Sequence, residues 1–287
     1  MSKKNMINEP RFNHKDAMLE TGKKAPYITF PPLSKLDYIT HGFSTKLGGV
    51  SVGCFESMNL GYNRGDLKEY VDKNYEIIGQ SIGFSHEDLV TTDQVHNIDI
   101  RVVKEEDKGK GIIIPRDYTG VDGLITNCSN IPLVTYYADC VPLYFVDTKN
   151  YAIGLSHSGW RGTVKKMAKE TIEAMQVNFN TKIQDLIVVI GPSICRKCYE
   201  VSLDVYEEFN KVFTPLQMDK IFDKKENEKF QLDLWEANRQ ILLDMKLMDE
   251  QVHISKVCTS CNSDLMFSHR VHGSERGSLC AFLMINR

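Results

Sequence analysis

The segment LSHSGWRGTVKKMA, residues 155–168, places His157, Trp160 and Arg161 within five positions. It lies where an apolar run typical of a strand gives way to helical spacing. A helix N-terminus offers unpaired N–H groups and the positive end of the helix dipole, and a guanidinium suits phosphate or carboxylate. Taken singly, the histidine and the tryptophan are more typical of structural residues. Together they indicate a metal or acid–base group beside an anion site, with an indole that can stack on a ring.

A second polar segment, the tripeptide ADC that ends at Cys140, precedes the run VPLYFVD, and YAIGLSH follows after a short turn. The two runs predict an antiparallel hairpin. If Asp147 faces Asn150, Cys140 lies opposite His157, where a thiolate and an imidazole can share a metal or a proton. A three-residue loop would instead place Cys140 beside Ser158. The pattern by itself therefore indicates only that Cys140 and His157 lie at the same open end of one hairpin.

Six segments, in order along the chain, resemble the landmarks of a known family: FSTKLGGVS, DQVH, DGLIT, ADCVPLYFVD, HSGWRGTV and GPSICRKCYEV. This is the bacterial laccase-domain family, first classed as multicopper polyphenol oxidoreductases and now regarded as purine nucleoside phosphorylases. The resemblance covers residues 26–287. It implies an α/β (α+β) layered sandwich with mixed β-sheets, related to cysteine hydrolases of the toxin-deamidase type.

The resemblance implies a metal, usually zinc, bound by His96, Cys140 and His157. Three protein ligands leave one position open, which is typical of a catalytic zinc. Copper could bind the same ligands. Multicopper oxidases, however, need many imidazoles in His-x-His pairs, and this chain has 8 histidines and no such pair. A copper-dependent polyphenol oxidase is therefore a weaker alternative, and we expect any such oxidation to be a side reaction.

Two reactions fit this site. In phosphorolysis, phosphate attacks C1′ of a purine nucleoside as the base leaves, so a phosphate cradle is needed. The predicted substrate and phosphate contacts are Lys46 (where the family often has arginine), Gly48, Gly49, Trp160 and Arg161, with Arg270 and Arg276 as second-rank candidates. In deamination, metal-bound hydroxide attacks C6 of adenosine and a carboxylate shuttles the proton. Asp139 is the candidate carboxylate, and its alternative role is that of a buried acceptor that orients His96 or His157.

We expect a purine nucleoside phosphorylase acting on adenosine, inosine and S-methyl-5′-thioadenosine, with adenosine deaminase as a second activity. One alternative is a Cys–His hydrolase with Cys140 as nucleophile and His157 as base. Another is a cysteine-rich zinc or copper store, which would have no use for the anion features. The expected partners are purine nucleosides and phosphate.

Two C-x-x-C pairs stand apart from these ligands. Cys195 and Cys198 form one pair and Cys258 and Cys261 the other. Such pairs predict a structural zinc site, and the alternative is a set of thiols without a metal.

The elements that must position these residues follow from the pattern. Strands are expected in PYITF, YITHGFSTK, IDIRVV, DGLITN, PLVTYY, VPLYFVD, YAIGLSH, DLIVVIGPS and CAFLMI. A helix is expected over 67–82, another after Gly162 with a buried stripe up to Met175, and two more in VSLDVYEEFNKVF and LDLWEANRQILLDM. Residues 1–25 read as a polar arm and residues 26–287 as a single domain.

Composition excludes several classes. The net charge of −3 gives no basic footprint for nucleic acid, and no apolar run reaches the roughly 20 residues of a membrane span. The N-terminus has no apolar core of a signal peptide. The 8 cysteines therefore indicate reduced thiols in the cytoplasm. We expect a monomer.

Overall fold

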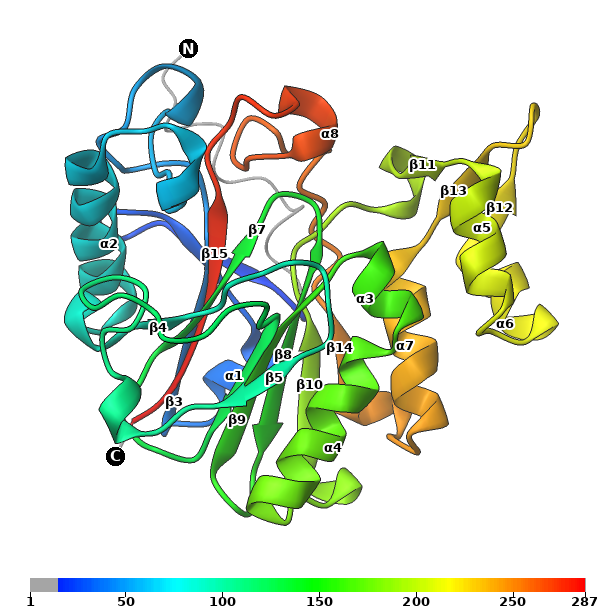
Figure 1. Cartoon of the computed structure of the whole chain (residues 1–287), viewed down its shortest axis with the longest axis horizontal. Coiled ribbons are helices and arrows are strands. Elements are labelled where there is room, and N and C mark those ends of the chain that lie inside the picture. Colours follow the sequence, from blue (N-terminus) through cyan, green and yellow to red (C-terminus); the bar gives the residue numbers. More distant parts are fainter. Residues whose placement is uncertain (1–14, 287) are drawn as a thin grey trace.

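The computed structural model describes residues 15–286, in which two six-stranded mixed sheets stack between layers of helices (Figure 1). The first sheet has the order β1-β2-β3-β15-β7-β4, and only its last pair is parallel. Its strands are Met18–Glu20 (β1), Tyr27–Thr29 (β2), Ile39–Ser44 (β3), Leu279–Ile285 (β15), Leu133–Tyr137 (β7) and Val90–Thr91 (β4).

The second sheet has the order β14-β10-β8-β9-β6-β5 and is parallel only at its two outer pairs. Its strands are Val252–Ile254 (β14), Leu186–Ile190 (β10), Val141–Asp147 (β8), Ala152–Ser158 (β9), Gly123–Thr126 (β6) and Ile100–Val102 (β5). A small antiparallel sheet of Glu200–Val201 (β11), Phe230–Leu232 (β13) and Phe222–Lys224 (β12) extends one side of the molecule. The mixed sheets of the expected sandwich are confirmed.

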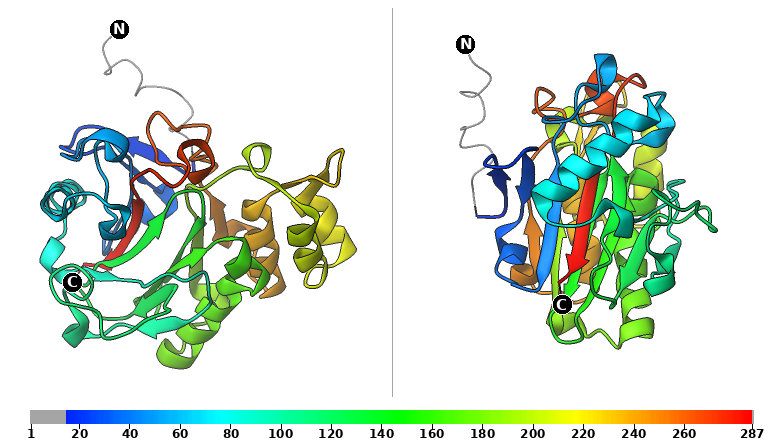
Figure 2. Two further views of the ribbon diagram at one scale, coloured as in Figure 1. Left: turned by 45° about the horizontal axis from the view of Figure 1, so that its top comes forward. Right: turned by 90° about the vertical axis from the view of Figure 1, so that its left-hand side faces the viewer.

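Helices cover the outer faces of the two large sheets. Lys68–Ile82 (α2) lies across the outer face of the first sheet, as Figure 2 shows. Met167–Phe179 (α4) and Leu234–Asp244 (α7) cover the second. The remaining helices are Pro31–Ser34 (α1), Trp160–Val164 (α3), Leu203–Asn210 (α5), Pro215–Ile221 (α6) and His269–His272 (α8). Short 3-10 turns lie at 53–55, 62–64, 86–88, 105–107, 183–185, 196–198 and 249–251.

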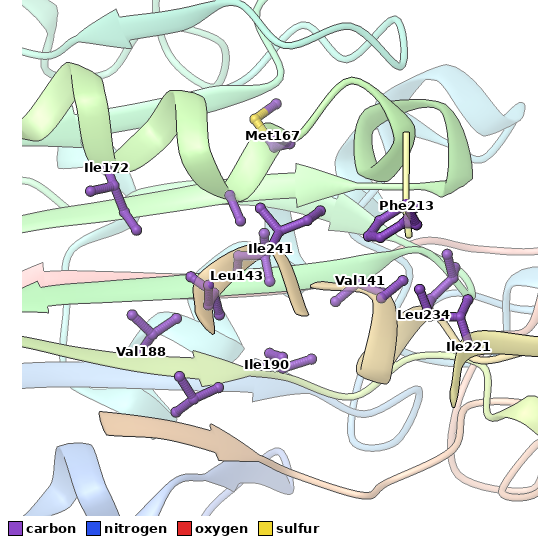
Figure 3. Close-up of a cluster of buried hydrophobic side chains, with 14 of the residues drawn as sticks. Val141, Leu143, Met167, Ile172, Val188, Ile190, Phe213, Ile221, Leu234 and Ile241 are labelled. Carbon is purple, nitrogen blue, oxygen red and sulfur yellow. The ribbon is translucent and has the colours of Figure 1, made fainter. Parts of the chain in front are cut away.

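The central strands are buried on both faces, so they read as continuous apolar runs rather than as alternating ones. In β8, Tyr144 and Val146 face the first sheet, whereas Leu143 and Phe145 face the helices. Figure 3 shows the helix-facing cluster, which includes Val141, Leu143, Met167, Ile172, Val188, Ile190 and Ile241. Each such side chain contributes about 1.5–3 kcal/mol when it leaves water. This core fixes the strand ends that carry the site.

The β8–β9 hairpin has a different register from the assumed one. Asp147 pairs with Ala152 rather than facing Asn150, so residues 148–151 form the loop. The Asp147 carboxylate accepts the N–H groups of Lys149 and Asn150, both at 2.9 Å, and this capped turn explains the longer loop.

As a consequence, Pro142 pairs with His157, and the predicted direct pairing of Cys140 with His157 is wrong. The shift involves an even number of residues, so inward and outward positions keep their faces. The weaker expectation, that Cys140 and His157 lie at the same end of the hairpin, is confirmed.

The helix expected after Gly162 is broken in two. Lys166 has a φ of 64°, which ends α3 before α4 begins at Met167. The predicted stripe is buried in α4. The other expected helices are present, and the one predicted over 67–82 begins one residue later.

Part of the predicted N-terminal arm lies outside the described residues. Within residues 15–25, β1 pairs with β2 at the edge of the first sheet, and Asp16 lies 3.4 Å from the imidazole of His253. The boundary at residue 26 stays a prediction. Across the described chain, no helix is long and apolar enough to cross a bilayer.

Candidate active site

Three side chains from different segments converge at one end of the second sheet. His157 lies in β9, Cys140 directly precedes β8, and His96 lies in the loop between β4 and β5. Their ligand atoms all lie within 4.8 Å of one another, and Cys140 Sγ is 4.0 Å from His96 Nε2. His157 is buried, Cys140 half-buried and His96 exposed. The structure thus places together the three residues that the resemblance identified as metal ligands.

Asp122, directly before β6, was not among the residues that the sequence singled out. Its Oδ1 lies 2.8 Å from Nδ1 of His157, and its backbone carbonyl accepts the His157 N–H at 2.8 Å. Its carboxylate also accepts the N–H groups of Val95, His96 and Asn97 at 2.9, 3.1 and 3.0 Å. One buried carboxylate therefore fixes both histidine-bearing segments. Asp122 belongs to the DGLIT segment, but nothing in that segment indicates that its carboxylate would meet the loop at 95–97.

The local electrostatics favour a charged thiolate. Loss of water contact by itself would raise the pKa of the Cys140 thiol, but His157 and His96 outweigh it and lower the pKa to about 6. For His157, burial would lower the pKa, but Cys140 and Asp122 raise the pKa to about 9. The Asp122 pKa is lowered, since His157 and the loop N–H groups outweigh the effect of burial. Without a metal, the contact between Cys140 and His157 thus favours the thiolate of the one and the protonated ring of the other.

Asp139 is buried next to Cys140 and adopts a φ of 94°. Its Oδ1 accepts the hydroxyl of Thr259 at 2.5 Å, and its Oδ2 accepts the backbone N–H of Arg270 at 2.7 Å. Asp122, rather than Asp139, contacts the ring of His157, and it also holds the backbone of His96. The role of Asp139 as a proton shuttle stays a prediction.

A cavity of about 1140 Å³ opens onto the three converging side chains. Besides them, its lining includes Asp139, several tyrosines and a set of basic side chains: Arg64, Lys68, Arg116, His269, Arg270 and Arg276. Arg276 is only 6% exposed, and its buried Nε has no hydrogen-bond partner in the described structure. Burial, followed by the nearby charge of Arg64, lowers the pKa of Arg276 to about 10. A buried guanidinium with an unused donor in a cavity is suited to an anion.

Most of the predicted phosphate contacts lie elsewhere. Among the described residues, the cavity lining includes Arg270, whose guanidinium lies over Tyr199 at 5.2 Å and donates to the Glu200 carbonyl. It does not include Lys46, Gly48, Gly49, Trp160 or Arg161.

The role of these residues in binding substrate or phosphate stays a prediction. Lys46 donates to the Ser263 carbonyl at 2.6 Å, and Arg161 stacks on Trp160 at 4.3 Å. Gly48 has a φ of 84°, and a Cβ at Gly49 would lie 2.1 Å from the Ser57 carbonyl oxygen. The two glycines are thus required by the turn itself.

The fold and the site define an α/β sandwich protein with two histidines and a cysteine at the sheet end, open to a large cavity. Residues 40–286 match the family described as multi-copper polyphenol oxidoreductase laccase, and the chain belongs to this family. The resemblance seen in the sequence is confirmed.

Relatives of this chain share most of its length. It is 36% identical over 246 residues to purine nucleoside phosphorylase YlmD of Bacillus subtilis, covering 84% of this chain and 87% of the relative. It is 32% identical to a purine nucleoside phosphorylase of Bacteroides thetaiotaomicron, covering 94% of this chain and 100% of the relative. The crystal structure of YlmD from Geobacillus stearothermophilus matches with a TM-score of 0.86 at 31% identity, covering 94% and 100% of the two chains. A Bacillus licheniformis hypothetical protein, YfiH, matches with a TM-score of 0.86 at 30% identity, covering 93% and 99%.

Proposed function

We propose that this protein is a purine nucleoside phosphorylase that acts on adenosine, inosine and S-methyl-5′-thioadenosine, with adenosine deaminase as a second activity. The observation that carries the proposal is the shared cavity, which joins the His96–Cys140–His157 group to the buried guanidinium of Arg276. The names of the two relatives, both purine nucleoside phosphorylases, agree with it.

The donor set fits zinc. Two imidazoles and a thiolate bind Zn²⁺, and three protein ligands suit a catalytic site. The Asp122 contact with His157 Nδ1 leaves Nε2 of that ring for the ligand role, as a carboxylate behind a metal-bound histidine does. When bound, zinc supplies a positive charge that polarises an oxygen or lowers the pKa of bound water.

The residues of the chain supply binding and orientation. In phosphorolysis, a phosphate oxygen bonds to C1′ as the bond from C1′ to the purine nitrogen breaks, and the departing purine takes up a proton. Arg276 offers the phosphate the guanidinium with which it lines the cavity, and Arg64 adds a second positive charge at the same wall. Asp139, held by Thr259 and the Arg270 N–H, is the candidate proton carrier for deamination.

A Cys–His hydrolase is the second candidate, because the lowered pKa of Cys140 and the raised pKa of His157 describe an activated nucleophile beside its base. The relation to toxin-type deamidases, which the family resemblance implies, is consistent with this alternative. Polyphenol oxidation by a multinuclear copper centre has less support. Across residues 15–286, the clusters of metal-binding side chains are the His₂Cys group and a group of four cysteines, and neither is rich in imidazoles.

Product analysis with adenosine, in buffers with and without phosphate, tests the proposal. We expect phosphate-dependent release of adenine and ribose 1-phosphate, and inosine in both buffers. The Cys140→Ala variant and zinc-stripped protein should lose both activities. Full phosphorolysis by either preparation would overturn the metal assignment, and no turnover in either buffer would favour the hydrolase.

A further inference from the structure

A second cluster of metal-binding side chains lies outside the His₂Cys group. The sulfur atoms of Cys195, Cys198, Cys258 and Cys261 all lie within 4.8 Å of one another. Cys261 Sγ is 3.4 Å from Cys198 Sγ and 3.9 Å from Cys195 Sγ. Four thiolates at the vertices of a tetrahedron around zinc, with Zn–S bonds of about 2.3 Å, lie about 3.8 Å apart. The spacing in the structure is therefore that of an S₄ metal site.

Two backbone N–H groups point at one of the four sulfur atoms. The N–H groups of Cys195 and Cys261 donate to Cys258 Sγ at 3.2 and 3.3 Å. Each pair also closes a tight turn, since the N–H of Cys198 donates to the Cys195 carbonyl at 3.0 Å and that of Asn262 to the Cys258 carbonyl at 3.2 Å. Donors around a thiolate stabilise its charge and orient it, as the outer shell of a metal site does. All four cysteines are free thiols rather than disulfides.

The two pairs belong to loops far apart in the sequence. Cys195 and Cys198 follow β10, whereas Cys258 and Cys261 follow β14, its parallel neighbour. The two loops also meet through backbone hydrogen bonds between Ser193 and Val257, at 3.1 Å, and between Thr259 and Ser193, at 3.2 Å. A metal at the four sulfur atoms would therefore crosslink two loops that the sheet has already placed side by side.

The loop after β10 lines the cavity, and both loops contact Asp139, which also lines it. Ile194 lines it, and the Ile194 N–H donates to the Asp139 carbonyl at 3.0 Å. Thr259, which directly follows Cys258, donates to the Asp139 carboxylate at 2.5 Å. The residue that precedes Cys140 is thus held in its φ of 94° by both loops.

We propose that Cys195, Cys198, Cys258 and Cys261 bind one Zn²⁺ in a closed, structural site that joins the loops after β10 and β14 and so fixes the Asp139 wall of the cavity. Four protein thiolates leave no open coordination position, so this ion has no role in the chemical step. The proposal does not depend on which reaction the cavity catalyses.

Metal analysis of matched variants tests it. Zinc is measured by mass spectrometry in the full-length protein and in variants that each remove one site. We expect about two zinc ions per chain in the unaltered protein, about one in Cys140→Ala, and about one in the Cys258→Ser/Cys261→Ser double variant. The matched control is Cys54→Ser/Cys128→Ser, which removes two thiols outside both groups and should keep about two.

Cobalt substitution of the Cys140→Ala variant is a second test. This variant keeps all four cysteines, so the result does not depend on whether the double variant folds. We expect the strong visible absorption and thiolate charge-transfer bands of tetrahedral Co²⁺–S₄ at about one cobalt per chain. Zinc titration should bleach these bands. Iron in place of zinc, or a Cys140→Ala protein that binds no metal and whose four thiols all react with a thiol reagent, would overturn the proposal.

Discussion

The carboxylate of Asp122 binds His157 through Nδ1 at 2.8 Å, and the same oxygen accepts the backbone N–H of His96 at 3.1 Å. One side chain thus positions an imidazole on a strand and the loop that carries the second imidazole. Because β6 and β9 are paired, the sheet places Asp122 beside His157, and the Asp122 carboxylate then holds the loop that carries His96. Asp122 is therefore a positioning residue for the candidate metal site.

The Asp122→Asn variant should bind zinc roughly 10–100-fold more weakly, because the amide keeps the volume but loses the charge that orients His157. Zinc affinity is measured by competition with a chromophoric chelator. Asp147→Asn is the control, since Asp147 is equally buried and caps the β8–β9 turn. It should lower stability without changing zinc affinity. Equal losses of affinity in both variants would show that Asp122 acts only through the fold.

Gly159 tests how tightly the site is packed. A Cβ at this position would lie 2.9 Å from Cys140 Sγ and 3.2 Å from His96 Cδ2. We expect Gly159→Ala to fold, yet to lose zinc affinity and about 100-fold in turnover, because displacement of positioned groups by about 1 Å has effects of this size. Gly162→Ala is the matched control, since its nearest contact would be an ordinary 3.5 Å. Unchanged affinity in Gly159→Ala would place the metal away from this side of Cys140.

Sequence patterns predicted the longer strands of the two large sheets and the longer helices, because continuous apolar runs and helical stripes report directly on burial. They did not predict α6 or the short strand β12 of the small sheet. Val141–Asp147 and Ala152–Ser158 are strands with every residue buried, as their composition indicates. The register of their hairpin could not be predicted, because it depends on the capping of the turn by the Asp147 side chain. The break between α3 and α4 at Lys166 likewise could not be predicted from the apolar pattern, since both helices keep one buried face.

For the candidate site too, some features could be predicted from the sequence and others could not. The metal-binding group was predicted from residue types at two strand ends and from the family resemblance. Asp122 was missed because its partners, the N–H groups at 95–97, come from a loop whose path cannot be read from sequence. The phosphate contacts were assigned to a glycine-rich turn and a helix start, whereas the buried basic group of the cavity comes from Arg276, near the C-terminus.

Arg276→Met should raise the KM for phosphate roughly 10–100-fold, since a hydrogen bond to a charged group contributes about 1.5–3 kcal/mol. Initial rates are measured against phosphate at saturating adenosine. Arg161→Met removes an exposed guanidinium that stacks on Trp160, and should leave this KM unchanged. A raised KM for phosphate in Arg161→Met, with an unchanged KM in Arg276→Met, would instead place the phosphate site at the helix start beside Arg161. Equal effects would indicate that net charge alone attracts the phosphate.

His41 makes the free energy of unfolding depend on pH. It is 6% exposed in β3, and its Nε2 accepts the Phe30 N–H at 2.8 Å, so it is held in the neutral form. Burial is the largest influence on this group and lowers the pKa of His41 to about 4. Above the unfolded pKa of about 6.5, both states carry a neutral ring and pH has no effect through this group. As pH falls from there towards 4, the unfolded chain takes up a proton that the folded protein excludes, so the free energy of unfolding decreases.

We expect the loss from His41 to approach about 3 kcal/mol near pH 4 and then to level off. His41→Gln keeps an acceptor for the Phe30 N–H but cannot be protonated, so it should remove this part of the pH dependence. Urea unfolding of both proteins at several pH values between 8 and 4 measures the effect. The difference at pH 8 reports only packing, because the ring is neutral in both states there, and it serves as the internal control. Parallel stability curves for the two proteins over this range would show that His41 is protonated inside the fold or that its segment opens before it titrates.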